Sequence, residues 1–169
     1  MELKEVLEKR RSIRRFTEEP VSREEILELM RAGMSGPSAC NKQPWEFYAV
    51  TDPDKLEGLR KATRFGNYRS PLAIVVCGNL ARALPLKFSA YWIQDCSAAT
   101  ENILLRVTDL GLGAVWCGAH PQKRVEDKIR ACLDLPDKQI PLNILFIGHP
   151  AEEREAGDWY DQTRVHFVE

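Results

Sequence analysis

The sequence predicts one globular domain, residues 1–169, in which helices pack on a central sheet. The length of 169 residues, with 44% hydrophobic and 29% charged side chains, is typical of a chain that buries a core without disulfides or structural metal. Helical and strand-like segments alternate from Pro53 onward, and no repeat or linker divides the chain. This pattern permits either a parallel α/β sheet or a mixed α+β layer.

Two amphipathic helices are predicted in the first part of the chain. Ser22 and Glu25 form a capping box, in which each side chain accepts a hydrogen bond from the other residue's backbone N–H, so a helix begins there. Apolar residues at helical spacing mark the two buried faces, with Leu3, Val6 and Leu7 in the first helix and Ile26, Leu27 and Met30 in the second. The periodicity is lost from Gly33 to Pro44, which predicts a loop.

Strands and helices then follow in turn. Short runs of apolar residues predict buried strands at 46–51, 72–77, 114–117 and 142–147. Helices are predicted to start at Pro53, to run from about Ala90 to Leu110, and to cover the region around 125–133. The second of these is the longest, and Gly111 follows it as a C-cap. The apolar residues of this helix repeat on one stripe, so we expect it to be central and largely buried.

Charge, hydropathy and cysteine usage exclude several classes of protein. The formal net charge of −1 gives no general reason to expect nucleic acid or an anionic membrane as partner. The longest apolar runs are far shorter than the ~20 residues that a membrane helix needs, and the N-terminus has no apolar signal region. The odd number of cysteines contains no C-x-x-C pair, which favours reduced thiols in a reducing compartment. We therefore expect a cytoplasmic protein.

The densest charge lies where the first helix ends. Basic side chains surround Ser12 at Lys9, Arg10, Arg11, Arg14 and Arg15. A guanidinium offers a planar fork of donors that matches phosphate oxygens, so this cluster is a candidate anion site. A solvated basic face at a helix C-terminus and a nucleic-acid contact are the alternatives.

The loop G-P-S-A-C-N-K-Q-P-W, residues 36–45, is the second candidate. Ser38, Asn41 and Gln43 supply hydroxyl and amide groups within a short stretch, and prolines restrict the backbone on both sides. Such an inventory suits a polyol or the edge of a heterocycle, although many loops of this composition serve only as turns. Cys40 is the best candidate for a reactive thiol, but we interpret it as inert.

The segment G-L-G-A-V-W-C-G-A-H-P, residues 111–121, is the third candidate. Its glycines follow a helix, whereas those of a dinucleotide fingerprint follow a strand, so a Rossmann site is not predicted. Gly118 would let backbone amides approach a flat ligand, and a cap followed by a turn is the alternative. Cys117 and His120 have the spacing of a zinc-ligand pair, but no second pair accompanies them. No nucleophile-elbow motif accompanies His149 and His166, so a hydrolase triad is not predicted.

Together these segments resemble the FMN-dependent nitroreductase family, in the same order along nearly the whole chain. The opening R-x-S-x-R motif is Arg10–Arg14, and the specific motif P-S-x-x-N-x-Q-P-W is Pro37–Trp45. The G-L-G-x-x-W-x-G turn is Gly111–Gly118, the G-x-P is Gly148–Pro150, and the tail from Tyr160 to His166 is similar to that of small members.

The resemblance implies a fold and an assembly. It implies an α+β, three-layer α/β/α sandwich with a mixed, mainly antiparallel central sheet and a domain-swapped C-terminal tail. The protein would be a homodimer that holds one FMN per active site at the subunit interface. The residues that it assigns to the flavin site are Arg10, Arg11, Ser12, Arg14, Pro37, Ser38, Ala39, Asn41, Asn67, Cys117, Gly118 and Arg154.

The same resemblance implies a role for each group. Residues 10–12 would reach the flavin phosphate and ribityl chain, Arg14 would lie near the pyrimidine edge, and residues 37–41 would come from the other subunit. The backbone of residues 117–118 would face flavin N5 and O4. Asn67 would lie at the flavin edge.

Arg154, after the G-x-P motif, would assist the phosphate. Many relatives carry a second basic residue nearby, whereas here Glu155, Ala156 and Gly157 follow. No metal is expected.

The activity implied is an oxidoreductase in which NADH or NADPH reduces FMN by hydride transfer to N5, and a nitroaromatic, quinone or similar acceptor is then reduced in a ping-pong cycle. No side chain would be a nucleophile or general base, because the flavin carries the chemistry while Arg14 and Gly118 tune it. Dehalogenation, dehydrogenation or flavin fragmentation on the same scaffold, and a non-enzymatic flavin-binding protein, are the alternatives. The chain has little between Arg64 and Tyr91 that would form the extended substrate-covering helices of larger members.

The tail supports a homodimer independently of the family. Large apolar residues follow the last predicted core strand at Trp159, Tyr160, Val165, Phe167 and Val168. Exposed together they would form a costly apolar patch, so we expect them to pack on a partner subunit.

Overall fold

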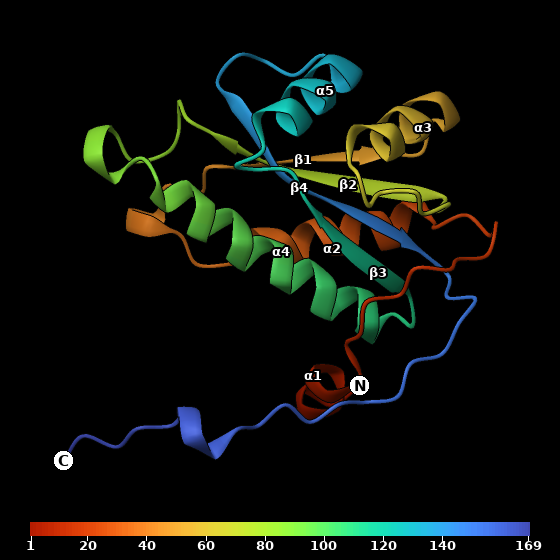
Figure 1. Cartoon of the computed structure of the whole chain (residues 1–169), viewed down its shortest axis with the longest axis vertical. Coiled ribbons are helices and arrows are strands. Elements are labelled where there is room, and N and C mark those ends of the chain that lie inside the picture. Colours follow the sequence, from red (N-terminus) through yellow and green to blue (C-terminus); the bar gives the residue numbers. More distant parts are fainter.

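The computed structural model describes all 169 residues and shows helices on both faces of a four-stranded sheet (Figure 1). The strands follow the order β1-β2-β4-β3, and every neighbouring pair is antiparallel. Their bounds are Trp45–Val50 for β1, Leu72–Asn79 for β2, Gly113–Gly118 for β3 and Gln139–Gly148 for β4. The α+β prediction is thereby confirmed.

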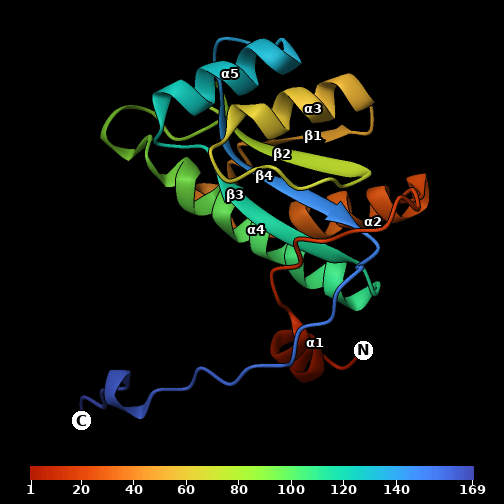
Figure 2. The same ribbon diagram turned by 45° about the vertical axis from the view of Figure 1, so that its right-hand side comes forward.

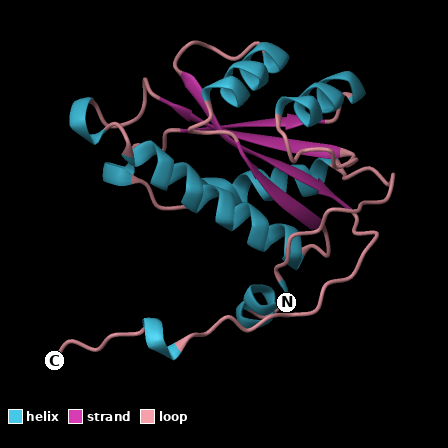
Figure 3. Ribbon diagram, in the orientation of Figure 1, coloured by secondary structure: helices cyan, strands magenta, loops and turns pink.

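The layers are arranged as the resemblance implied (Figures 1 and 3). Helices α2 and α4 cover one face of the sheet, and α3 and α5 cover the other. The short α1 lies apart from the sheet beside the C-terminal segment (Figure 2). The helices are α1 Leu3–Lys9, α2 Arg23–Met34, α3 Pro53–Ala62, α4 Tyr91–Asp109 and α5 Lys123–Leu133.

Local chemistry explains where the helices begin. At α2 the predicted capping box is present, because Ser22 Oγ accepts from Glu25 N at 3.2 Å and Glu25 Oε2 accepts from Ser22 N at 2.8 Å. At α3 the Asp52 carboxylate caps Lys55 N at 2.9 Å, and Pro53 occupies the first turn, where no N–H is needed.

The sheet separates two apolar cores, and α4 is the central element of one of them. The side chains of Cys96, Ala99, Ile103 and Val107 on α4 are buried against the sheet, which confirms the predicted buried helix. The other core lies under α3 and α5. Because both faces are covered, the inner strands β2 and β4 are predominantly apolar, with Asn143 of β4 as a buried exception, and parallel strands share this pattern. The sequence therefore could not separate the two kinds of sheet.

The parallel component of the predicted mixed sheet is one isolated bridge, between Ser12 and Ala114. Here the segment after α1 lies along the outer edge of β3, where Ile13 N donates to Ala114 O at 2.8 Å. Two further contacts, a bridge between Phe16 and Pro150 and a hydrogen bond from Thr17 N to His149 O, hold the same segment to the chain after β4. The basic cluster is thus attached to the edge of the sheet.

None of the helices has the length and apolarity needed to cross a membrane.

This attachment depends on Gly113. A methyl group added there would lie 2.8 Å from Ile13 Cβ. This atom is bonded to the backbone, so rotation of the Ile13 side chain cannot move it away. We expect Gly113→Ala to lower the free energy of unfolding by about 1–3 kcal/mol, the usual cost of overpacking. Gly118→Ala in the same strand is the control, because its methyl group meets nothing within 4 Å. Denaturant unfolding of both variants is the measurement, and equal stability would contradict the prediction.

Candidate functional site

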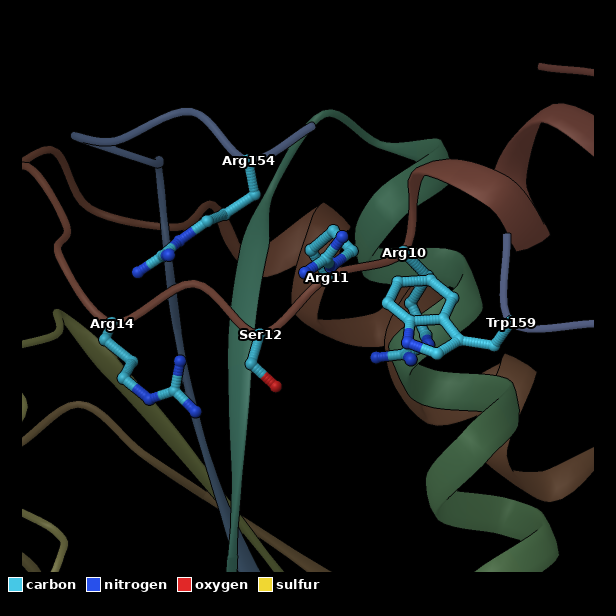
Figure 4. Close-up of a pocket in the computed structure, with 6 residues that line it drawn as sticks. All are labelled: Arg10, Arg11, Ser12, Arg14, Arg154 and Trp159. Atoms are coloured by element: carbon cyan, nitrogen blue, oxygen red, sulfur yellow. The ribbon is translucent and has the colours of Figure 1, made fainter. Parts of the chain in front are cut away.

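A cavity of about 350 Å³ opens where the segment after α1 passes the edge of β3 (Figure 4). Arginines provide most of its lining. In Figure 4 the guanidinium groups of Arg14 and Arg154 lie on one side of Ser12, and Arg10, Arg11 and Trp159 lie on the other. Five of these six lining residues are predicted site residues, so the first motif and Arg154 are brought together.

Arg11 is held in place by the C-terminal segment. Its Nη1 donates to Glu155 O at 2.7 Å, and its guanidinium carbon lies 4.6 Å from the centre of the Trp159 ring. The indole thus contacts an arginine of its own chain and is still 67% exposed, and its packing on a partner stays a prediction. Sequence periodicity gives no signal for such a contact across nearly 150 residues.

Glu152 joins the two chain segments that form the cavity. Its Oε1 accepts from the backbone N–H of Arg14 at 2.6 Å, and its Oε2 lies 3.4 Å from Arg154 Nη2. The hydrogen bond from Arg14 N, with the nearby charge of Arg154, lowers the pKa of this carboxyl below its usual range. The sequence analysis did not identify this residue.

The cavity carries more positive than negative charge. Among its arginines, Arg10 lies 3.5 Å from Glu101 and Arg154 pairs with Glu152, whereas the guanidinium groups of Arg11 and Arg14 contact no carboxylate. Two guanidinium groups without a paired anion, beside a serine hydroxyl, suit a doubly charged phosphate.

The second motif forms a tight turn on α4. Residues Ala39–Asn41 make a short 3₁₀ helix whose Ala39 N donates to Asp95 Oδ1 at 2.8 Å. Ser38 Oγ accepts from Gln43 N at 2.9 Å, and Asn41 Oδ1 accepts from Gln43 Nε2 at 3.0 Å. The hydroxyl hydrogen of Ser38 and the amide hydrogens of Asn41 are therefore the donors that the turn presents to a ligand.

The first and second motifs do not share a cavity within one chain. The turn packs on the N-terminal half of α4, where it contacts Asp95, whereas the arginine cavity lies beside β3 and its Arg10 contacts α4 at Glu101. Pro37, Ser38, Ala39 and Asn41 are thus separated from Arg10–Arg14.

The third motif occupies β3. Cys117 faces the core under α3 and α5, where burial raises the pKa of its thiol to about 11, and its Sγ lies 3.9 Å from Phe65 O. Gly118 is exposed at the end of the strand, with open space where a side chain would be. The backbone here is accessible to a ligand, and the Cys117 side chain is not. Trp116, 37% exposed on the same strand face as Gly118, is an exposed indole that the predicted site residues do not include.

The remaining predicted residues have separate surroundings. Asn67 is exposed on the loop that brings Phe65 to Cys117, and it does not line the arginine cavity. His120 Nδ1 lies 2.8 Å from Oε1 of the buried Glu126, whereas Cys117 Sγ contacts Phe65 O. The two residues with zinc-like spacing thus contact different groups. All five cysteines are free thiols, and Cys40 is exposed.

Comparison with known proteins identifies the family. The sequence matches the model of the nitroreductase family over residues 7–67 and 63–149. The chain belongs to the nitroreductase family. The resemblance carried by the three motifs is therefore confirmed.

Several nitroreductase relatives match over almost the whole chain. A protein of Methanothermobacter thermautotrophicus, provisionally named NADH dehydrogenase/NAD(P)H nitroreductase, is 36% identical over 99% of this chain and 87% of its own. A crystal structure from Parabacteroides distasonis with the same provisional name is 35% identical, with a TM-score of 0.92 over 99% of this chain and 98% of that one. An FMN-dependent nitroreductase from Clostridium difficile is 30% identical, with a TM-score of 0.88 over 97% and 98%. The fold and the oxidoreductase class predicted from the sequence agree with these relatives.

The role of Glu152 can be tested by pH. Because its folded pKa lies below the ordinary value of 4.5, its ionised form stabilises the protein above that pH, and the stabilisation is lost as pH falls through the folded pKa. We expect Glu152→Gln to lower the melting temperature at pH 7, and the difference from the wild type to shrink as pH falls from about 6 to about 3. Glu153→Gln is the control. A difference that stays constant with pH would contradict the role of this carboxylate.

Proposed function

We propose that this nitroreductase-family protein is an FMN-dependent NAD(P)H oxidoreductase that reduces nitroaromatic, quinone or similar electron-poor acceptors. The observation that carries the proposal is the cavity at the edge of β3, in which arginines surround Ser12. In this proposal residues 1–169 act as one nitroreductase-like domain, in the cytoplasm, on small molecules.

The donor set fits one phosphate group. Arg11 and Arg14 are not neutralised by carboxylates, and the Ser12 hydroxyl lies between them (Figure 4). A flavin mononucleotide carries one such terminal phosphate. The C-terminal end of β3 then leads away from this cavity to the exposed backbone of Gly118. A cation site and an open strand edge are the features that a phosphate tail and a flat ring need.

FMN, when bound, supplies the redox chemistry by accepting a hydride from NAD(P)H at N5 and passing it to the acceptor. The chain's own residues bind and orient. Arg10, Arg11, Ser12 and Arg154 hold the phosphate and ribityl chain, and Arg14 stabilises negative charge at the pyrimidine edge. The backbone N–H groups at residues 117–118 donate to the ring, and Asn67 lies at its edge.

The rest of the site belongs to a second copy in this proposal. Ser38 and Asn41 lie on the turn held by Asp95 and do not line the arginine cavity of their own chain, which therefore holds only part of the predicted set. In a two-fold dimer, residues 37–41 of each subunit serve the flavin of the other.

The edge of the sheet offers a place for the partner's tail. Strand β1 is an edge strand, and a cavity of about 250 Å³ lies between it and α2, lined mainly by apolar residues that include Leu27, Met30 and Phe47. The C-terminal segment extends away from the body of its own chain (Figure 2), with Phe167 86% exposed. We propose that this tail crosses to the partner and covers that edge.

The phosphate site is tested by Arg10→Ala. Loss of one charge-assisted hydrogen bond of about 1.5–3 kcal/mol corresponds to at least about tenfold weaker FMN binding. Titration of apoprotein with FMN, followed by quenching of flavin fluorescence, measures the dissociation constant. Arg124→Ala, on α5 and away from the cavity, is the matched control. Unchanged affinity in both Arg10→Ala and Arg11→Ala would place the phosphate elsewhere.

The shared site is tested by mixing subunits. Arg10→Ala and Asn41→Ala homodimers should each be impaired at both sites. A mixed dimer should contain one intact site, with Arg10 from one subunit and Asn41 from the other, so FMN binding and activity should partly return. Sedimentation at low concentration provides a second measurement. A folded monomer that binds FMN and is active would show that the site is built within one chain.

A further inference from the structure

Asp95 is a buried carboxylate to which the proposed chemistry gives no task. It lies on α4, is 5% exposed, and accepts the backbone N–H of Ala39 at 2.8 Å. From this contact we infer that Asp95 is the positioning residue that holds the turn at residues 38–41 in the shape in which it meets the flavin of a partner subunit. The inference rests on the proposed function and extends it to a residue that touches no ligand.

The turn needs an external hold because its backbone is unfavourable. Cys40, Asn41 and Gln43 have φ values of 49°, 52° and 47°, in the left-handed region that side chains with a Cβ seldom adopt. Such conformations persist where the surrounding structure determines them, and they gather at ligand sites. Three of them within four residues therefore indicate a shape that is maintained for a purpose.

The contacts that maintain this shape come from one face of α4. Asp95 accepts from Ala39 N, and one turn further along the helix the backbone of Ala99 packs so closely on Gly36 that an added Cβ would lie 3.3 Å from Ala99 N. At the other end of the clamped peptide, the Ser38 carbonyl accepts from Asn41 N at 3.0 Å. Both ends of the Ser38–Ala39 peptide group are thus fixed.

The orientation of this peptide determines what the turn presents. With the Ala39 N–H directed at Asp95, the Ser38 side chain accepts from Gln43 N and keeps its hydroxyl hydrogen for a ligand. A carboxylate suits this task because it only accepts hydrogen bonds and binds a backbone N–H more strongly than a neutral acceptor does.

Asp95 does not serve α4 itself as a cap. The helix begins at Tyr91 after Ala90, which provides no side-chain cap, and the side-chain hydrogen bond of Asp95 goes to the turn. Its hydrogen bond to Ala39 N therefore stabilises the contact between α4 and the turn rather than the end of the helix.

Two substitutions of Asp95 test whether its hydrogen-bond acceptor, rather than its packing alone, supports FMN binding. Asp95→Ala should weaken FMN binding about tenfold or more, the effect of one charge-assisted hydrogen bond, whereas Asp95→Asn keeps an acceptor and should stay within about threefold of wild type. Fluorescence titration of the dimeric apoprotein measures both. Thr100→Val is the matched control: it removes the buried hydrogen bond to Asn143 from the same helix and should lower stability while leaving FMN affinity within about twofold.

A double variant tests whether Asp95 acts through the turn. If it does, Asp95→Ala combined with Asn41→Ala should bind FMN no more weakly than the worse single variant, because Asp95 would act only through the turn that carries Asn41. If the losses of FMN affinity of the two single variants multiply in the double variant, the inference is overturned. A Thr100→Val variant that loses as much FMN affinity as Asp95→Ala would also overturn it.

Should Asp95→Ala fail to fold, Ala39→Pro removes the same hydrogen bond from the side of the turn. Ser38 has φ −144° and ψ 151°, a conformation that a following proline accepts. This variant should show the same loss of FMN affinity, and wild-type affinity would overturn the inference. Wild-type protein that takes up no FMN would overturn the proposed function, whereas FMN-binding wild type with an equally tight Asp95→Ala variant would overturn the role of Asp95 alone.

Discussion

The candidate site depends on one edge-to-edge contact, the attachment of residues 10–16 to β3. The hydrogen bond from Ile13 N to Ala114 O, and the fit of Ile13 over Gly113, fix the segment after α1 against strand β3. Arginine side chains lose much rotamer freedom when they are ordered around a ligand. Ordering the backbone costs conformational entropy as well. Because the backbone of residues 10–16 is already fixed in the folded chain, ligand binding has to order only the side chains.

Helix α4 imposes the second constraint. Its buried face fills the core on one side of the sheet, so the helix is fixed relative to the strands. The turn at residues 38–41 is fixed to this helix by Asp95, whereas Arg10 of the arginine cavity contacts Glu101 further along it. The residues of the turn do not line the arginine cavity of their own chain. In the proposed two-fold dimer, the turn of one subunit would meet the cavity of the other.

The parts of the structure that local chemistry determines could be predicted from the sequence. The capping box at Ser22, the buried stripe of α4 and the strand runs depend on residues close in sequence, and the three motifs lie in order along the chain. Contacts between distant segments could not be predicted in this way. Glu152 with Arg14, Trp159 with Arg11 and Asp95 with Ala39 join residues 56 to 148 positions apart, and no periodicity or spacing encodes such pairs. Strand direction was equally hidden, because a sheet covered on both faces is apolar in either arrangement.

The carboxylates around the cavity are distributed unevenly, and this separates the tasks of its arginines. Arg10 and Arg154 each have a carboxylate neighbour that orients the guanidinium, at the cost of part of its charge. Arg11 is oriented by a neutral carbonyl and an indole, so it is fixed with its charge intact. Glu152 accepts a hydrogen bond from the backbone N–H of Arg14 and so fixes the position of the segment. The Arg14 guanidinium itself has no carboxylate partner. In the proposed function Arg14 would stabilise negative charge that develops on the flavin only after reduction, and an unpaired guanidinium on a fixed backbone suits that role because no carboxylate cancels its charge beforehand.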